Sequence, residues 1–202
     1  MPKQVDREER RRALAEAVFA IIAVRGLAAV SLRDVAAEAG VSMGAVQHYF
    51  TSKDEMLRFA LDHLRTRVLS RLQGRLSRLD RPSRRHLVEA ALEVMLPLDE
   101  PSRQEACVNV AFVELATVDP AYGALLREGY RHLVEMSKAH LRGAAADGEL
   151  AAGTDPDEEA VAVYFLAQGL IAPLLVGLFT PDEARGILRT RLDQVFAPAR
   201  AD

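Results

Sequence analysis

Apolar residues recur at helical spacing along nearly the whole chain, and no stretch alternates apolar and polar positions over the length of a strand. Glycine and proline residues separate the periodic stretches, as they commonly do at helix ends. The pattern therefore predicts an all-α fold of about nine helices. The expected helices cover residues 7–25, 32–39, 43–50, 53–79, 83–96, 102–118, 121–146, 156–179 and 182–197.

Residues 31–55 carry the clearest local signals. Ser31, Ser42 and Ser52 each stand where a side chain can cap the next helix, and Ser52 with Glu55 has the spacing of a capping box. Gly40 follows the first short helix at a position that favours a left-handed residue. Two short helices joined by such a turn are typical of the helix-turn-helix motif. We expect a three-helix domain in residues 1–52 and a second, helical domain in residues 53–202.

The second helix of this motif has a side suited to DNA. If Val46 and Phe50 point inward, small and polar residues cover the open side. Gln47 can bond an adenine edge, Met43 can touch a thymine methyl, and hydroxyls or Lys53 suit phosphates. The predicted DNA-contacting residues are Arg33, Ser42, Met43, Gly44, Ala45, Gln47, His48, Tyr49, Thr51 and Lys53. A helical corner that binds no nucleic acid is the alternative.

Basic residues are concentrated in the first part of the chain. Residues 1–87 hold 17 Lys and Arg against 10 Asp and Glu, a net of +7, whereas residues 88–202 hold 9 against 19, a net of −10. A basic N-terminal part suits a polyanionic partner, although an uneven surface charge without a partner explains the numbers equally well. The helix expected at 53–79 carries arginines that are most simply interpreted as a solvated face. They are Arg58, Arg65, Arg67, Arg71, Arg75 and Arg78.

Residues 7–57 resemble the DNA-binding domain of the TetR-type one-component regulators. The matching residues are Leu32, Val35, Ala36, Ala39, Gly40, Val41, Ser42, Gly44, His48, Tyr49, Phe50, Ser52, Lys53 and Leu57. The resemblance implies a dimeric regulator with a helical ligand-sensing domain behind the DNA-binding one. Members of the family often carry a backbone-contacting tyrosine where Gln47 stands, which leaves open whether position 47 reads a base.

Residues 161–179 contain no charged side chain, which makes the segment a transmembrane candidate by length. Its acidic flanks and the interruptions at Pro173 and Gly177 favour a helix buried on all sides instead. One side would face the chain's own core and the other a second subunit, and the resemblance places the dimer interface in the last two helices. The predicted dimerisation residues are Tyr164, Gln168, Ile171, Leu175, Leu188 and Leu192. A twofold dimer implies an inverted-repeat operator.

An effector pocket is expected between the middle helices. Its predicted lining is Phe59, His63, Met95, Asn109, Phe112, Glu114, Tyr122, Tyr130 and Phe165. Glu114 shares a helix face with apolar residues, so its carboxylate would meet either a cationic group of the ligand or an arginine of a neighbouring helix.

No catalytic, metal or cofactor site is expected. Residues 40–44 spell the hydrolase pattern GxSxG, but the required strand is missing before it. His132, Met136 and His140 share one helix face without a metal-binding motif. The single cysteine, Cys107, and the polar N-terminus fit a cytoplasmic protein. We therefore expect a homodimeric repressor that a small molecule releases from its operator. A helical enzyme, a metal-binding bundle or a membrane-associated protein is the alternative.

Overall fold

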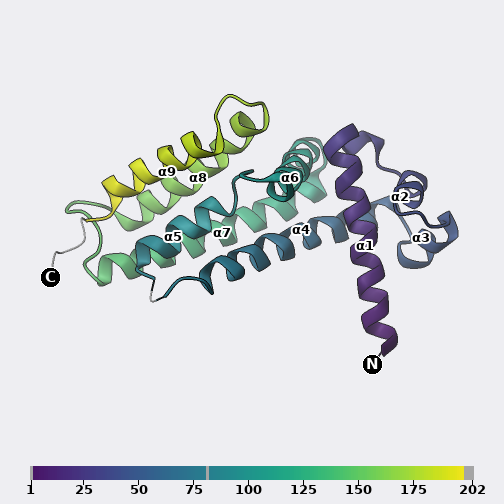
Figure 1. Cartoon of the computed structure of the whole chain (residues 1–202), viewed down its shortest axis with the longest axis horizontal. Helices are drawn as coiled ribbons and strands as arrows, with labels where there is room; N and C mark the ends of the chain where they lie inside the picture. Colours follow the sequence, from purple (N-terminus) through teal and green to yellow (C-terminus); the bar gives the residue numbers. More distant parts are fainter. Residues whose placement is uncertain (1, 81, 198–202) are drawn as a thin grey trace.

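The computed structural model describes residues 2–80 and 82–197, and it is built from α-helices (Figure 1). The helices are α1 (Pro2–Arg25), α2 (Leu32–Glu38), α3 (Met43–Tyr49), α4 (Lys53–Leu76), α5 (Arg84–Glu93), α6 (Glu100–Val118), α7 (Pro120–Ala146), α8 (Pro156–Leu175) and α9 (Pro181–Val195), with a 3₁₀ turn at Leu27–Ala29. The all-α prediction is confirmed. The largest error at a C-terminus is in α8, which ends four residues early because Gly177 adopts a left-handed φ of 76°.

Serine caps fix the start of α2, α3 and α4. The hydroxyls of Ser31, Ser42 and Ser52 each accept a hydrogen bond of 3.1 Å from the backbone N–H three residues later. The capping box expected at Ser52 is half right. Glu55 turns back, but its Oε2 accepts from the backbone N–H of Thr51 at 2.8 Å rather than from that of Ser52. Reciprocal boxes cap α6 and α9 instead.

The buried apolar side chains form two clusters. The first joins α1, α2 and α3 to the N-terminal half of α4, and it also contains Val108, Ala111 and Phe112 of α6 and Tyr122 of α7. The second cluster contains side chains of α5, α7, α8 and α9, and Ala106 is its residue from α6. The first cluster is therefore completed by residues that lie far beyond the helix-turn-helix in the sequence.

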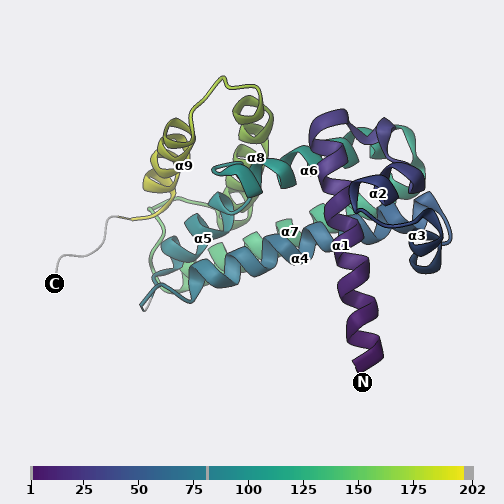
Figure 2. The ribbon, with the colours of Figure 1, turned by 45° about the vertical axis from the view of Figure 1, so that its right-hand side comes forward.

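Helix α4 connects the two regions. Figures 1 and 2 show α2 and α3 at one end of the molecule, with α4 running from there along the body beneath α5 and α6. Met56, Leu57, Ala60, Leu61 and Leu64 are buried in the first cluster, whereas the later turns of α4 contact α5. The orientation of α3 relative to the body thus depends on how α4 is held.

Helix α8 is the described helix that is long and apolar enough to cross a membrane by length and composition. One face of it, with Ala160, Val163, Ala167 and Leu170, belongs to the second cluster and packs against α7 and α9. The opposite face carries the exposed ring of Phe165. The helix is thus buried on one side within this chain.

Two leucines of α7 give a matched test of the second cluster. Leu141 is fully buried and Leu133 is 39% exposed. Leu141→Ala is expected to lower the free energy of unfolding by about 2–5 kcal/mol because it leaves a cavity, whereas Leu133→Ala should cost less than about 1 kcal/mol. Urea denaturation of both variants at one protein concentration measures the difference. Equal losses would mean that Leu141 is not in a packed core.

Candidate nucleic-acid interface and effector region

Helix α3 presents the side that the sequence predicted. Val46 and Phe50 are fully buried, whereas Gly44, Gln47 and His48 are exposed, with Met43 exposed by 44% at the start of the helix. Ala45 and Tyr49 are half-buried at the flanks. The outward face therefore combines small residues with hydrogen-bonding side chains, as a helix that enters the major groove requires.

Donors for phosphate surround this face at the helix ends. Lys53 opens α4 and is exposed, as is Arg33 on α2, and neither has an ion pair within the described part of the chain. The Ser42 hydroxyl accepts from the backbone N–H of Ala45 and keeps its own hydrogen for a phosphate. Thr51 differs, because its backbone N–H and its hydroxyl both donate to Glu55 Oε2 at 2.8 Å. Both of its donors are engaged in this conformation.

Arg11 anchors α1 behind the recognition helix. Its guanidinium lies 4.8 Å from the ring centre of Phe50 and 4.3 Å from that of Phe59, and it pairs with Glu55 at 3.3 Å. The bonds from Thr51, with a smaller contribution from Arg11, lower the pKa of Glu55. Sequence reasoning missed this role, because the aromatic partners of Arg11 lie far from it in the sequence.

A second anchor joins the first turn of α7 to the first turn of α4. The hydroxyl of Tyr122 donates to Asp54 Oδ1 at 2.9 Å, and Arg58 binds the same carboxylate at 2.7 Å while lying over the tyrosine ring. These two donors lower the pKa of Asp54, and burial together with that carboxylate raises the pKa of Tyr122. The tyrosine therefore stays a neutral donor at physiological pH.

Four predicted effector residues belong to, or pack against, the first apolar cluster instead of lining a pocket. The rings of Phe112 and Tyr122 are buried and stack at 6.0 Å. Phe59 lies under Arg11, and His63 places Nε2 at 2.6 Å from Glu16 Oε1. Each of these side chains already has a structural partner.

The other predicted effector residues lie apart from these. Met95 packs against the second cluster, Asn109 is half-buried on α6, and Tyr130 is half-buried on α7. Phe165 is 51% exposed. A surface hollow of about 500 Å³ lies over α9, but its lining contains none of the predicted effector residues. The predicted effector residues therefore occupy different environments, and none of them lines this hollow.

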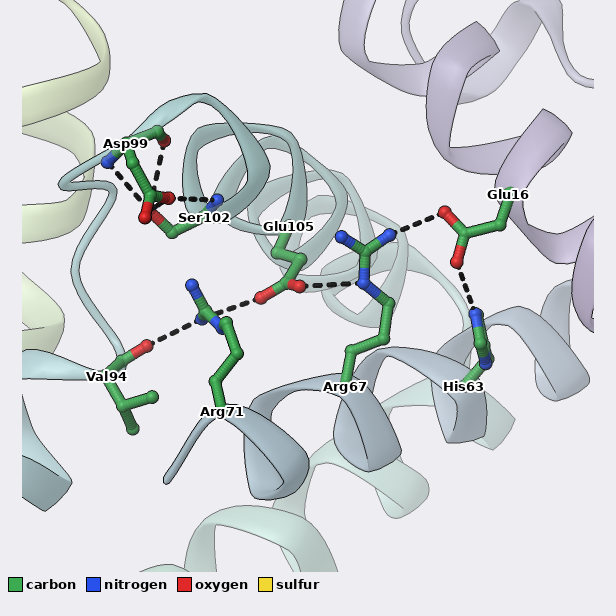
Figure 3. A network of polar contacts seen from close by, with 8 residues as sticks. All are labelled: Glu16, His63, Arg67, Arg71, Val94, Asp99, Ser102 and Glu105. Atoms are coloured by element: carbon green, nitrogen blue, oxygen red, sulfur yellow. Dashed lines mark hydrogen bonds and ion pairs between the residues drawn. The ribbon is translucent and has the colours of Figure 1, made fainter. Parts of the chain in front are cut away.

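The buried carboxylate of α6 is Glu105, not Glu114. The Glu114 side chain is exposed, so its carboxylate needs neither a ligand nor an arginine to offset burial. Glu105 is 3% exposed and lies between Arg67 and Arg71 (Figure 3). Arg75 similarly binds the buried Glu93 of α5 at 2.6 Å. The interpretation of these α4 arginines as a solvated face is therefore wrong. The four-residue spacing of these arginines could have indicated a shared ion-pair surface, because it places them on one side of the helix.

The predicted dimerisation residues are largely internal. Tyr164, Ile171, Leu188 and Leu192 are at most 5% exposed within a single chain, so they are not available to a partner. Gln168 and Leu175 are half-buried, and Gln168 Nε2 donates to the hydroxyl of Tyr164 at 3.0 Å. When a helix is apolar on every side, its sequence does not indicate which side packs against the core of the same chain. The large apolar side chains that α8 and the turn after it leave exposed are Phe165, Val176 and Leu178.

The part of the chain that the structure describes holds no group of three or more His, Cys, Asp or Glu arranged to bind a metal ion.

Comparisons with known proteins match two regions of the chain. Residues 14–59 match the bacterial regulatory proteins of the tetR family, and residues 84–197 match the C-terminal region of BetI-type transcriptional repressors. The HTH-type transcriptional regulator PksA of Bacillus subtilis is 34% identical over 176 residues, 84% of this chain and 80% of its own length. The regulator BetI of Vibrio campbellii is 26% identical over 199 residues, 96% of each chain.

Solved structures agree on the fold. A transcriptional regulator from Rhodococcus sp. Rha1 gives a TM-score of 0.77 at 32% identity, covering 92% of this chain and 95% of that one. A regulator from Saccharomonospora viridis, crystallised in complex with choline, gives a TM-score of 0.83 at 24% identity, covering 95% of this chain and all of that one.

Proposed function

Since the chain belongs to the TetR family of bacterial regulatory proteins and ends in a BetI-type repressor region, we propose that it represses transcription as a homodimer bound to an inverted-repeat operator. It is a DNA-binding transcriptional regulator of a family of regulators rather than enzymes. The observation that carries the DNA-binding role is the exposed face of α3, with Gly44, Gln47 and His48 outward and Lys53 beside it. We place the protein in the cytoplasm, where a bacterial operator is accessible.

Base and phosphate roles can be separated with two variants. Lys53→Ala should weaken binding to every duplex and reduce the salt slope by about one unit, because it removes one phosphate contact. Gln47→Ala should cost about 1–3 kcal/mol at a single base position if its amide reads a base edge. Fluorescence anisotropy at two salt concentrations measures both, using a duplex selected from random sequences and a scrambled control.

Two results would contradict this assignment. Wild-type protein that binds selected and scrambled duplexes equally would overturn sequence-specific DNA binding. Gln47→Ala that loses equal affinity on both duplexes would assign Gln47 to the backbone instead of a base.

The exposed face of α8 supports the dimer. Ala162, Phe165, Gly169, Ala172 and Val176 recur at intervals of three and four residues, and all five are exposed. Small residues at these positions allow close helix approach, and Phe165 and Val176 leave apolar area in water that a partner would cover. The α8 and α9 helices of two chains would then form a four-helix bundle. A twofold axis through that bundle would relate the two recognition helices, and the proposed operator is therefore an inverted repeat.

A matched pair of charge substitutions tests the dimer face. Phe165 on α8 is 51% exposed and Leu69 on α4 is 49% exposed. The two side chains are therefore equally exposed but lie on different helices. Phe165→Asp should shift the protein from dimer to monomer in sedimentation velocity, because the carboxylate would be desolvated at the interface. Leu69→Asp should leave the dimer intact. A dimer that tolerates Phe165→Asp would place the interface elsewhere.

The aromatic side chains of Tyr130 on α7 and Tyr164 on α8 lead us to propose a cationic effector. Burial raises the pKa of Tyr164 to about 12, with a smaller contribution from Tyr130. Aromatic faces bind quaternary ammonium groups, and the Saccharomonospora viridis neighbour was crystallised with choline. We therefore assign Tyr130 and Tyr164 to the effector site and Phe165 to the dimer, the reverse of the roles expected for positions 164 and 165.

Choline is the probe for this effector class. Millimolar choline should weaken binding to the selected duplex by about 5- to 150-fold, the usual range of allosteric coupling, and Tyr130→Ala should abolish the response. Sodium chloride at equal ionic strength is the control. Release that is identical with choline and with sodium chloride would rule out recognition of the quaternary ammonium group.

A further inference from the structure

Two arginines on successive turns of α4 share one carboxylate from α6. Arg67 Nε donates to Glu105 Oε1 at 2.8 Å, and Arg71 Nη2 lies 2.7 Å from Glu105 Oε2 (Figure 3). The second contact is an ion pair whose geometry falls outside that of a hydrogen bond, and Arg71 Nη2 also donates to the carbonyl of Val94 at 2.8 Å. Each oxygen of Glu105 therefore faces a different turn of α4.

Such a contact fixes orientation more than it adds stability. Glu105 is 3% exposed, and removing a carboxylate from water offsets most of what its ion pairs contribute. Consistent with this cost, burial raises the pKa of Glu105 despite the two arginines. Residues four apart lie on one side of a helix, so a carboxylate held by both Arg67 and Arg71 restricts rotation of α4 about its own axis.

The same network reaches the DNA-binding region. Arg67 Nη1 donates to Glu16 Oε2 of α1 at 2.5 Å, and the other oxygen of Glu16 binds His63 of α4. Arg71 meanwhile ties α4 to the end of α5 through Val94. The contacts around Glu105 thus join α1 and α4 to α6 and the end of α5 (Figure 3).

We infer that Glu105 is a positioning residue for operator binding: by holding Arg67 and Arg71 it sets the rotation of α4, and hence the separation of the two recognition helices. This inference rests on the proposed dimeric, DNA-bound function. Residues 50–52 join α3 to α4, and both helices belong to the first apolar cluster, so a rotation of α4 about its own axis carries α3 with it. Glu105 itself contacts no DNA in this arrangement.

Operator spacing provides a readout that a purely structural role would not change. The selected duplex is compared with versions carrying one base pair more or one fewer between the half-sites, and with a scrambled duplex at low salt. Glu105→Gln keeps the shape of the side chain and removes its charge. Glu100→Gln, an exposed glutamate on the first turn of α6, is the matched control.

Glu105→Gln should weaken binding to the selected duplex by about 3- to 30-fold and reduce the penalty for altered spacing, because α4 is less restrained. Binding to the scrambled duplex at low salt and the behaviour of Glu100→Gln should match wild type. If Glu105→Gln does not fold, Arg71→Gln breaks the same contact from the more exposed side and should relax spacing in the same way.

Three outcomes would overturn the inference. Unchanged affinity and spacing preference in a folded Glu105→Gln protein would leave Glu105 with a packing role only. Equal weakening on selected and scrambled duplexes would indicate general destabilisation. Wild-type protein without any sequence preference would overturn the proposed function, and the role of Glu105 with it, and that failure is recognised before any variant is compared.

Discussion

One uninterrupted helix, α4, satisfies two different sets of partners, and the rest of the molecule is arranged around that constraint. Its N-terminal half is packed by apolar side chains such as Met56 and Leu64, which are buried with the helix-turn-helix. Its C-terminal half is held by ion pairs, since Arg71 and Arg75 bind buried carboxylates of α6 and α5. Apolar packing resists separation of surfaces, whereas paired charges at fixed positions resist rotation. Together they define where α3 lies relative to the body.

The DNA-binding region shares its apolar cluster with the body of the molecule. Phe112 and Tyr122 complete its apolar cluster from α6 and α7, and the hydroxyl of Tyr122 holds Asp54 within the first turn of α4. A molecule that binds between α7 and α8 can act on the recognition helix only if it prefers a different arrangement of these shared helices. The shared cluster supplies the physical connection, because a shift of α6 or α7 moves side chains that α4 also contacts.

Sequence alone predicted the helices and the outward face of α3, and it failed where neighbours in space decide. Serine caps, Gly40 and the inward pair Val46 and Phe50 are local signals, so they can be read from spacing. Glu105 and Glu114 are both acidic residues on one largely apolar helix, and only the position of α4 distinguishes the buried carboxylate from the exposed one. Tyr164 and Phe165 are adjacent on an apolar helix, so periodicity could not tell which ring faces the core.

Urea unfolding followed by two tryptophan probes tests whether the helix-turn-helix and the body share one core. The chain contains no tryptophan, so Tyr49→Trp on α3 and Phe179→Trp after α8 each report on one region without interference. Tyr49 packs against the first apolar cluster and Phe179 against the second. A shared core predicts that both probes and the far-ultraviolet circular dichroism give the same midpoint at one protein concentration. If the Tyr49→Trp probe instead reports a transition at clearly lower urea than the Phe179→Trp probe, the shared core is contradicted, because the DNA-binding region would then unfold on its own.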